Sequence, residues 1–208
     1  MVLDLGPLGD RAFLARFAAT VRSRGLEGVD DVVLAYRSTA VFAAPGRCDL
    51  DALERALRAL EPTPGAANPG ARHVVPVLYD GPDLAYVAST LGLSTDEVVN
   101  LHAGRDYVVF AVGFLPGFPY AGYLPPALAG LARRAEPRLA VAAGSIAIAG
   151  RQTGIYPAQS PGGWHLLGRT PLQIADPELG RFPIRAGDVI RFRPIDATEF
   201  AERCNERP

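Results

Sequence analysis

Most of the residues suited to chemistry lie in one stretch of this chain, between Gly113 and Asp176. Glycine and proline alternate there with aromatic side chains, in runs such as GFLPGFPY (113–120) and SPGGW (160–164). Glycine permits backbone conformations closed to other residues, proline fixes them, and aromatic rings supply rigid contact surface with a polar tip. Such loops indicate a preshaped binding cleft, but tight turns at the corners of a barrel would use the same residues.

His102 is the strongest single candidate for acid–base chemistry. It follows a predicted helix and precedes a predicted strand, where an imidazole facing a cleft can transfer a proton or donate a hydrogen bond. A histidine at a helix end can equally bind the last carbonyl groups of that helix. The sequence leaves both interpretations open.

Polar residues within the stretch from Gly113 to Asp176 are suited to a small polar ligand. Arg138 and Arg169 can each bind a carboxylate through two parallel hydrogen bonds. Gln152, Thr153 and Tyr156 can hydrogen-bond to a small amide. These five side chains therefore predict a site for a compound that carries a carboxylate or an amide.

Composition argues against several classes of protein. All 21 basic residues are arginine, which excludes a Schiff-base lysine and a Walker-type phosphate-binding lysine, and the net charge of −1 argues against nucleic-acid binding through bulk charge. Three scattered histidines predict no metal site, and Ser145 and Ser160 lie outside any Gly-x-Ser-x-Gly turn of a serine hydrolase. No apolar run approaches the ~20 residues of a membrane span, and the two cysteines form no framework, so we expect a soluble cytoplasmic protein.

The elements expected in the first part of the chain alternate between strand and helix. Residues 11–17 alternate as a strand does, 18–25 suggest a short helix, and 32–36 with 39–43 suggest a hairpin. Asp49 is placed to cap a helix over 50–60, whose leucines share one face, and 61–70 form a linker before a strand at 73–78. This order predicts a ferredoxin-like split βαβ domain over 1–78, with its linker at about 61–72.

A second domain is expected over residues 79–208. Residues 83–91 predict a helix ended by Gly92, and Ser94 with Glu97 forms a capping box that opens another helix towards Leu101. Beyond Tyr107, short apolar runs broken by glycine and proline indicate an antiparallel barrel or sandwich. The fold class expected for the whole chain is α+β.

Several motifs of the chain resemble one known family. GFLPGFPYAGYLP (113–125), PR before AVAAGSIAIAG, and RQTGIYPAQSPGGWHLLGRTP (151–171) resemble the KipI-like family of 5-oxoprolinase B subunits, also labelled allophanate hydrolase subunit 1. The resemblance extends through YDGPDL (79–84), GLSTDEVVNLH (92–102), and LGPLGDRA and AYRSTAVF near the start. It covers nearly the whole chain, with Ala121 and Ala142 as the visible departures.

The resemblance implies a fold and an activity. The fold is a ferredoxin-like domain followed by a cyclophilin-like β-barrel, and the activity is the ATP-dependent opening of 5-oxo-L-proline to L-glutamate. It further implies that partner subunits A and C complete the enzyme, that ATP binds mainly to a partner, and that the chain is inactive alone. The expected catalytic residues are His102, Arg138 and Gln152. The expected substrate-binding or interface residues are Phe118, Tyr120, Thr153, Tyr156, Ser160, Trp164 and Arg169.

Two other functions remain open at this stage. Some family members resemble protein-binding inhibitors of a histidine kinase, and the same pair of domains resembles part of biotin-dependent urea carboxylase. The latter requires a biotin carrier, which this chain lacks.

Overall fold

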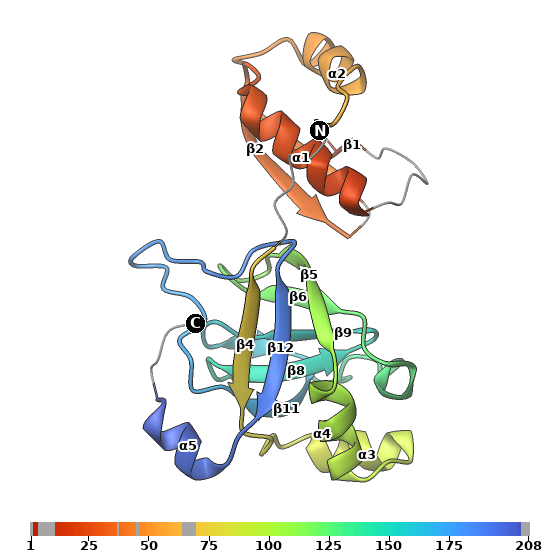
Figure 1. Cartoon of the computed structure of the whole chain (residues 1–208), viewed down its shortest axis with the longest axis vertical. Helices are drawn as coiled ribbons and strands as arrows, with labels where there is room; N and C mark the ends of the chain where they lie inside the picture. Colours follow the sequence, from red (N-terminus) through yellow and green to blue (C-terminus); the bar gives the residue numbers. More distant parts are fainter. Residues whose placement is uncertain (1, 4–10, 37, 45, 64–69, 205–208) are drawn as a thin grey trace. The chain divides into compact units, whose positions relative to one another are not determined.

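The structure is a computed structural model that describes residues 2–3, 11–36, 38–44, 46–63 and 70–204, with the backbone alone for 2, 3, 11 and 12. The chain divides into two compact units, Met1–Pro69 and Gly70–Pro208 (Figure 1). Most of the expected linker, residues 64–69, lies outside the described residues, as do Arg37 of the expected hairpin turn and most of the LGPLGDRA motif.

The first unit combines two helices with a three-stranded antiparallel sheet. The sheet has the order β1-β3-β2, formed by β1 (Val2–Leu3), β2 (Val29–Ala35) and β3 (Ser38–Ala43). Helices α1 (Arg11–Arg24) and α2 (Leu50–Arg58) bury leucine, phenylalanine and valine side chains against β2 and β3 in one core. The expected hairpin is confirmed, and so is the Asp49 cap, whose side chain accepts from the backbone N–H groups of Asp51 and Ala52.

The expected strand at residues 11–17 is wrong, because these residues open α1. Alternation of apolar residues over so short a run is ambiguous between strand and helix. The buried positions Leu14, Phe17, Ala18 and Val21 follow the helical spacing i, i+3, i+4, i+7, and this face packs into the core.

The position of β4 (Arg72–Val77) differs from the sequence-based expectation. That strand was expected to complete the ferredoxin-like sheet, but it pairs in parallel with β12 (Val189–Pro194) in the second unit. In the first unit β3 lies between β1 and β2, as in a split βαβ arrangement, and no fourth strand joins them among the described residues. The ferredoxin-like fold therefore stays a prediction.

The second unit is built on a seven-stranded sheet with the order β11-β8-β9-β6-β5-β12-β4 (Figure 1). The remaining members are β5 (Asp106–Val112), β6 (Pro119–Gly122), β8 (Ser145–Ala149), β9 (Gln152–Ile155) and β11 (His165–Arg169). All neighbouring strands pair antiparallel except β12 and β4. Residues from these strands and the flanking helices form the largest hydrophobic core of the chain.

The two edges of this sheet meet just beyond β4. The backbone N–H of Leu78 donates to the carbonyl of Arg169 at 2.9 Å, and the N–H of Arg169 donates back to the carbonyl of Leu78 at 2.9 Å. This reciprocal pair joins the end of β11 to the chain that follows β4. The sheet is therefore a nearly closed barrel, one of the two arrangements, barrel or sandwich, that the short apolar runs indicated.

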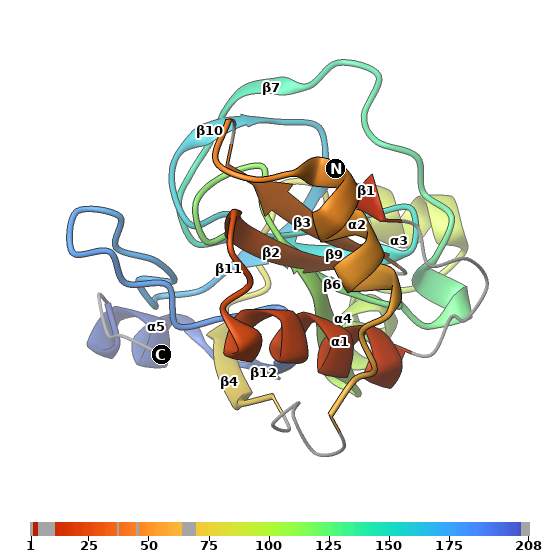
Figure 2. The ribbon, with the colours of Figure 1, turned by 90° about the horizontal axis from the view of Figure 1, so that it is seen from above.

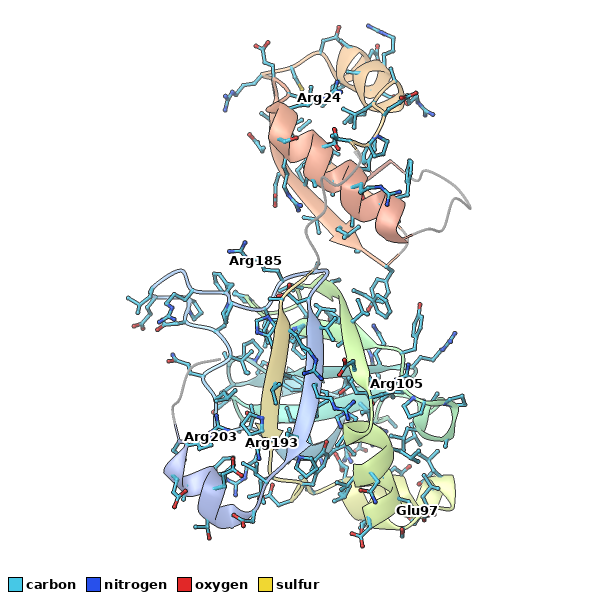
Figure 3. The ribbon with its side chains drawn as sticks, in the orientation of Figure 1. Arg24, Glu97, Arg105, Arg185, Arg193 and Arg203 are labelled. Atoms are coloured by element: carbon cyan, nitrogen blue, oxygen red, sulfur yellow. The ribbon has the colours of Figure 1, made fainter. Side chains whose placement is uncertain are left out.

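Helices lie at one end of the barrel strands in Figure 1. Helix α3 (Leu84–Leu91) ends at Gly92 with a left-handed φ of 69°, and α4 (Thr95–Ala103) opens with the predicted capping box of Ser94 and Glu97. Helix α5 (Ala197–Glu202) follows β12, and Figure 3 shows Arg193 and Arg203 beside it, where both pair with Glu199.

A small two-stranded sheet supplements the barrel. Strands β7 (Arg138–Val141) and β10 (Ser160–Gly162) pair antiparallel and lie side by side in Figure 2. The short 3-10 helix η1 (Pro126–Leu128) and an irregular segment precede β7. Within the described residues, no helix is both long enough and apolar enough to cross a membrane.

Two glycines at the barrel closure allow the backbones to approach closely. A Cβ atom on Gly81 would lie 2.3 Å from the carbonyl oxygen of Leu166, and one on Gly168 would lie 2.3 Å from that of Leu78. We predict that Gly81→Ala or Gly168→Ala lowers the free energy of unfolding of the second unit by at least about 2 kcal/mol, because backbone atoms must move apart.

Urea unfolding followed by Trp164 fluorescence measures this effect, since Trp164 is the single tryptophan and lies in the second unit. Gly113→Ala is the matched control, because its Cβ would have no neighbour within 4 Å. We expect the control to change stability by less than about 1 kcal/mol. Equal stability of all three variants would contradict the close approach.

Candidate functional site

His102 lies in a chain of side-chain hydrogen bonds inside the second unit. Its Nδ1 is 2.7 Å from the hydroxyl oxygen of Tyr79, and its Nε2 is 2.9 Å from Oγ1 of Thr153. Thr153 donates its own hydroxyl proton to the carbonyl of Ala147 at 3.2 Å, so it accepts from the Nε2–H of His102. Nδ1 is then left to accept the proton of Tyr79, which defines the neutral Nε2–H tautomer.

The surroundings of His102 disfavour its protonated form. The ring is completely buried, stacks on Phe192 with ring centroids 4.5 Å apart, and lies beside Tyr107, whose hydroxyl donates to the His102 carbonyl. Burial lowers the pKa of His102 to about 3. The geometry therefore favours a positioning residue that holds Tyr79, while direct proton transfer stays a prediction.

The buried carboxylate of Asp83 joins three parts of the second unit. Its Oδ1 accepts from Nη2 of Arg138 at 2.7 Å and Nη1 of Arg134 at 3.1 Å, and its Oδ2 accepts from the backbone N–H of Leu166 at 2.7 Å. Asp83 precedes α3 without capping it, because these donors use its side chain. Burial alone would raise the pKa of Asp83, but the hydrogen bonds from Arg138 and Leu166 and the two positive charges outweigh it and hold that pKa below its usual range.

Arg169 forms a separate and more exposed pair. Its Nη2 lies 2.8 Å from Oδ2 of Asp80, and its guanidinium group lies 4.5 Å from the ring centroid of Phe200. About half of the Arg169 side chain is exposed, against 23% for Arg138. The two arginines expected to bind a carboxylate are therefore each already paired with an aspartate of the segment 79–83.

The aromatic residues of the predicted set gather in one cluster. Phe118 lies at its centre, with ring centroids 4.8 Å from Tyr120, 5.1 Å from Tyr156 and 5.6 Å from Trp164. The cluster forms a second hydrophobic core within the second unit, beside the main core of the barrel. It includes Val141 of β7 and outward-facing side chains of the barrel strands. The hydroxyl of Tyr156 accepts from the backbone N–H of Trp164, while burial raises the pKa of Tyr156.

Ser160 and Gln152 occupy different places. Ser160 is buried on β10 and donates to the carbonyl of Pro161 at 3.1 Å, whereas Gln152 is half-buried at the start of β9, opposite Gly122 and Ala149. In the structure His102 is hydrogen-bonded to Thr153, and the four aromatic residues contact one another. Arg169 lies at the barrel closure and takes no part in the hydrogen bonds that hold Arg138.

Sequence reasoning missed the residues that hold these groups in place. Tyr79, Asp80 and Asp83 all belong to the motif YDGPD, which was noted only as a point of resemblance. A dense group of an aromatic, two acids, a glycine and a proline before a helix was the available signal. Arg134 carried no such signal. Among the described residues, no three His, Cys, Asp or Glu side chains gather as metal ligands do.

The comparison with protein families places the chain in a defined class. Residues 8–182 match the family described as carboxyltransferase domain, subdomain C and D, and the chain belongs to this family. It is 48% identical over 161 residues to a protein of Escherichia coli O157:H7 named as the B subunit of 5-oxoprolinase, covering 75% of this chain and 73% of that protein. The protein of the same name from Bacillus subtilis (strain 168) is 43% identical over 130 residues, 61% of this chain and 54% of its own length.

Solved structures show the same architecture. The structure of TTHA0988 matches 95% of this chain with a TM-score of 0.83 and 37% identity, and the matched part is 40% of that chain. PH0987 from Pyrococcus horikoshii matches 96% of this chain and 95% of its own length, with a TM-score of 0.59 and 34% identity. Urea carboxylase of Kluyveromyces lactis matches 92% of this chain and 20% of its own, with a TM-score of 0.69 and 18% identity, which shows a shared fold alone.

Replacing Asp83 tests the buried ion pairs. We predict that Asp83→Asn lowers the free energy of unfolding of the second unit by about 3 kcal/mol, because it leaves two arginines without their charged partner. Asp80→Asn removes the exposed pair with Arg169 and is expected to lower it by less than about 1 kcal/mol. Urea unfolding followed by Trp164 fluorescence measures the free energy of unfolding of both variants. Equal losses of stability would contradict the importance given to the buried ion pairs of Asp83.

The same variant carries a pH signature. The pKa of folded Asp83 lies below its unfolded value of about 4, so its contribution is complete above that pH and is lost as pH falls through the folded pKa. The stability gap between the wild type and Asp83→Asn should therefore hold at neutral pH and narrow below about pH 4. A gap independent of pH down to unfolding would contradict this assignment.

The state of His102 can be observed directly by nuclear magnetic resonance of ring nitrogens. We predict that His102 carries its proton on Nε2 and does not titrate between about pH 5 and pH 8, because burial lowers its pKa to about 3. The Thr153→Val variant should disturb this tautomer, since it removes the acceptor of Nε2–H while keeping the side-chain shape. A titration midpoint for His102 above about pH 5 would show that the ring reaches solvent.

Proposed function

We propose that this chain acts as the B-type component of an ATP-dependent 5-oxoprolinase, which opens the lactam of 5-oxo-L-proline to give L-glutamate. The observation that carries this proposal is the 48% identity over 161 residues to the Escherichia coli protein of that name. Relatives from Bacillus subtilis and Haemophilus influenzae bear the same name at 43% and 42% identity. The chain spans between about half and three quarters of the length of these relatives, so the activity itself is part of the proposal.

The proposal includes partners and ATP. Subunits A and C complete the enzyme, ATP binds mainly to a partner subunit, and this chain is inactive alone. The absence of lysine supports that division, as does the pairing of Arg134, Arg138 and Arg169 with aspartates. The ferredoxin-like and cyclophilin-like topologies of the two units, and a cytoplasmic location, also belong to this proposal.

ATP is needed because the lactam is a stable amide. Transfer of the γ-phosphate of ATP to the lactam oxygen makes the ring carbon a better electrophile. Water then attacks that carbon, the ring C–N bond breaks, and the nitrogen takes a proton to become the amine, which leaves an acyl phosphate of glutamate. A second water cleaves this acyl phosphate to glutamate and inorganic phosphate. Overall, 5-oxo-L-proline, one ATP and two waters yield L-glutamate, ADP and phosphate.

The residues of this chain take roles consistent with their positions. Arg138 contacts the substrate carboxylate through the guanidinium N–H groups that Asp83 does not use, and Gln152 contacts the lactam. His102 fixes Tyr79 and the segment after it. Phe118 and its cluster form the wall of a shared cleft or a subunit interface.

Reconstitution tests the proposal. The chain is assembled with its A and C partners, and 5-oxoproline-dependent ATP hydrolysis and glutamate release are measured together. We expect activity with this chain, none without it, and a loss of at least about tenfold for Arg138→Gln, the size of one lost charged hydrogen bond. Glu54→Gln, which removes an exposed pair on α2, should leave activity unchanged.

A folded and assembled complex without activity would overturn the proposal. Urea carboxylation and histidine-kinase binding are the functions to examine in that case. The likeness to urea carboxylase rests on 18% identity and supports the fold alone.

A further inference from the structure

Three buried side-chain nitrogen atoms of the described residues have no hydrogen-bond partner: Nε of Arg134, Nη1 of Arg138 and Nδ1 of His165. An unpaired buried polar atom is destabilising, so such atoms are rare in folded proteins. All three belong to the same contact between two segments of the second unit. A shared cause is therefore expected.

The contact joins residues 132–138 to residues 163–166. The backbone N–H of Arg134 donates to the carbonyl of Gly163 at 2.8 Å, and Nε2 of His165 donates to the carbonyl of Ala132 at 2.9 Å. Both Arg134 and Arg138 reach Oδ1 of Asp83, whose other oxygen accepts from Leu166, next to His165. Asp83 thus binds both arginines directly, and His165 precedes the residue whose backbone binds the same carboxylate, so the three unpaired atoms lie along one contact between the two segments.

The chemistry of these atoms is complementary to a particular kind of ligand. The two guanidinium atoms are N–H donors, while Nδ1 of neutral His165 is an acceptor, because Nε2 holds the ring proton against the Ala132 carbonyl. Two arginines against one carboxylate leave an excess positive charge. A matching ligand offers anionic or carbonyl oxygens together with an N–H group.

We propose that Arg134, Arg138 and His165 form the part of the substrate site that recognises a small cyclic amide acid, with the arginines on its oxygens and His165 on its ring N–H. The inference rests on the proposed function, and 5-oxo-L-proline has the required groups. His165 is then the residue that distinguishes a lactam from a ring nitrogen without a proton. Tyr86, stacked on His165 with centroids 5.4 Å apart, holds the imidazole in place.

The covering segment lies at the surface. Ala135, Glu136 and Pro137 are at least partly exposed, and the side chains of Arg134 and Arg138 are 34% and 23% exposed although the unpaired atoms are not. Residues 132–137 form no helix or strand. They are held by the bonds of the Arg134 backbone and the Ala132 carbonyl, together with the ion pair of Arg134 with Asp83. Because the three atoms are buried, the proposed binding requires this segment to move so that a ligand can reach them.

Paired substitutions separate recognition from folding. His165→Gln keeps a donor for the Ala132 carbonyl and removes the Nδ1 acceptor, whereas His165→Asn keeps a polar atom near the Nδ1 position. Arg134→Lys keeps the charge beside Asp83 and removes the Nε donor. The affinity of each complex for 5-oxo-L-proline and for its N-methyl derivative is measured by calorimetry, with thermal unfolding as the check on folding.

We expect the wild-type complex to bind 5-oxo-L-proline about tenfold more tightly than the N-methyl derivative, because the derivative cannot donate one of the hydrogen bonds. His165→Gln should lose that preference, His165→Asn should retain part of it, and Arg134→Lys should weaken both ligands about equally. Unchanged affinities in folded, active variants would overturn the inference and leave the proposed function standing, with ordered water covering these atoms. A wild-type complex that neither binds nor hydrolyses 5-oxoproline would overturn both.

Discussion

A carboxylate removed from water needs strong donors around it, and Asp83 has three of them. Two come from arginines that precede or begin β7, and the third is the backbone of β11. One side chain thus ties the start of α3 to the barrel and to the segment that crosses its outer face. This contact determines the geometry of the candidate site, because Asp83 fixes the orientation of Arg138.

The neighbouring residues extend the same principle. Tyr79 is hydrogen-bonded to His102 in the interior, and Asp80 pairs with Arg169 at the surface. With the bond of Asp83 to the backbone of β11, the segment 79–83 is held at three points. The glycines at 81 and 168 let its backbone contact β11 directly, where Leu78 and Arg169 close the sheet. The same contacts therefore close the barrel and position the polar residues. A change to either is expected to alter the other.

Local signals in the sequence were sufficient for local structure. The Asp49 cap, the Ser94 and Glu97 capping box and the Gly92 helix end each depend on residues within one turn, and all are confirmed. The strand expected at 11–17 failed because seven residues do not separate a period of two from one of 3.6. The partner of β4 could not be predicted, since β12 lies over a hundred residues away.

The site shows the same division between local and distant information. His102 and Thr153 were singled out by type, but their hydrogen bond spans 51 residues, and the bond of Arg138 to Asp83 spans 55. Burial, which decides that His102 is neutral, is a property of the assembled barrel. The aromatic cluster was foreseen as rigid contact surface, and the structure shows most of it buried as a second core.

Hydrogen exchange at the backbone N–H of Leu166 tests most directly whether Asp83 organises the second unit. In the wild type this amide should exchange only when the barrel opens, because it donates to the buried Oδ2 of Asp83. In Asp83→Asn the exchange of this amide should accelerate by about a hundredfold. Its exchange in Asp80→Asn, and the exchange of the β2–β3 hairpin amides in Asp83→Asn, should not change. Equal protection of Leu166 in the wild type and Asp83→Asn would contradict the central role given to this carboxylate.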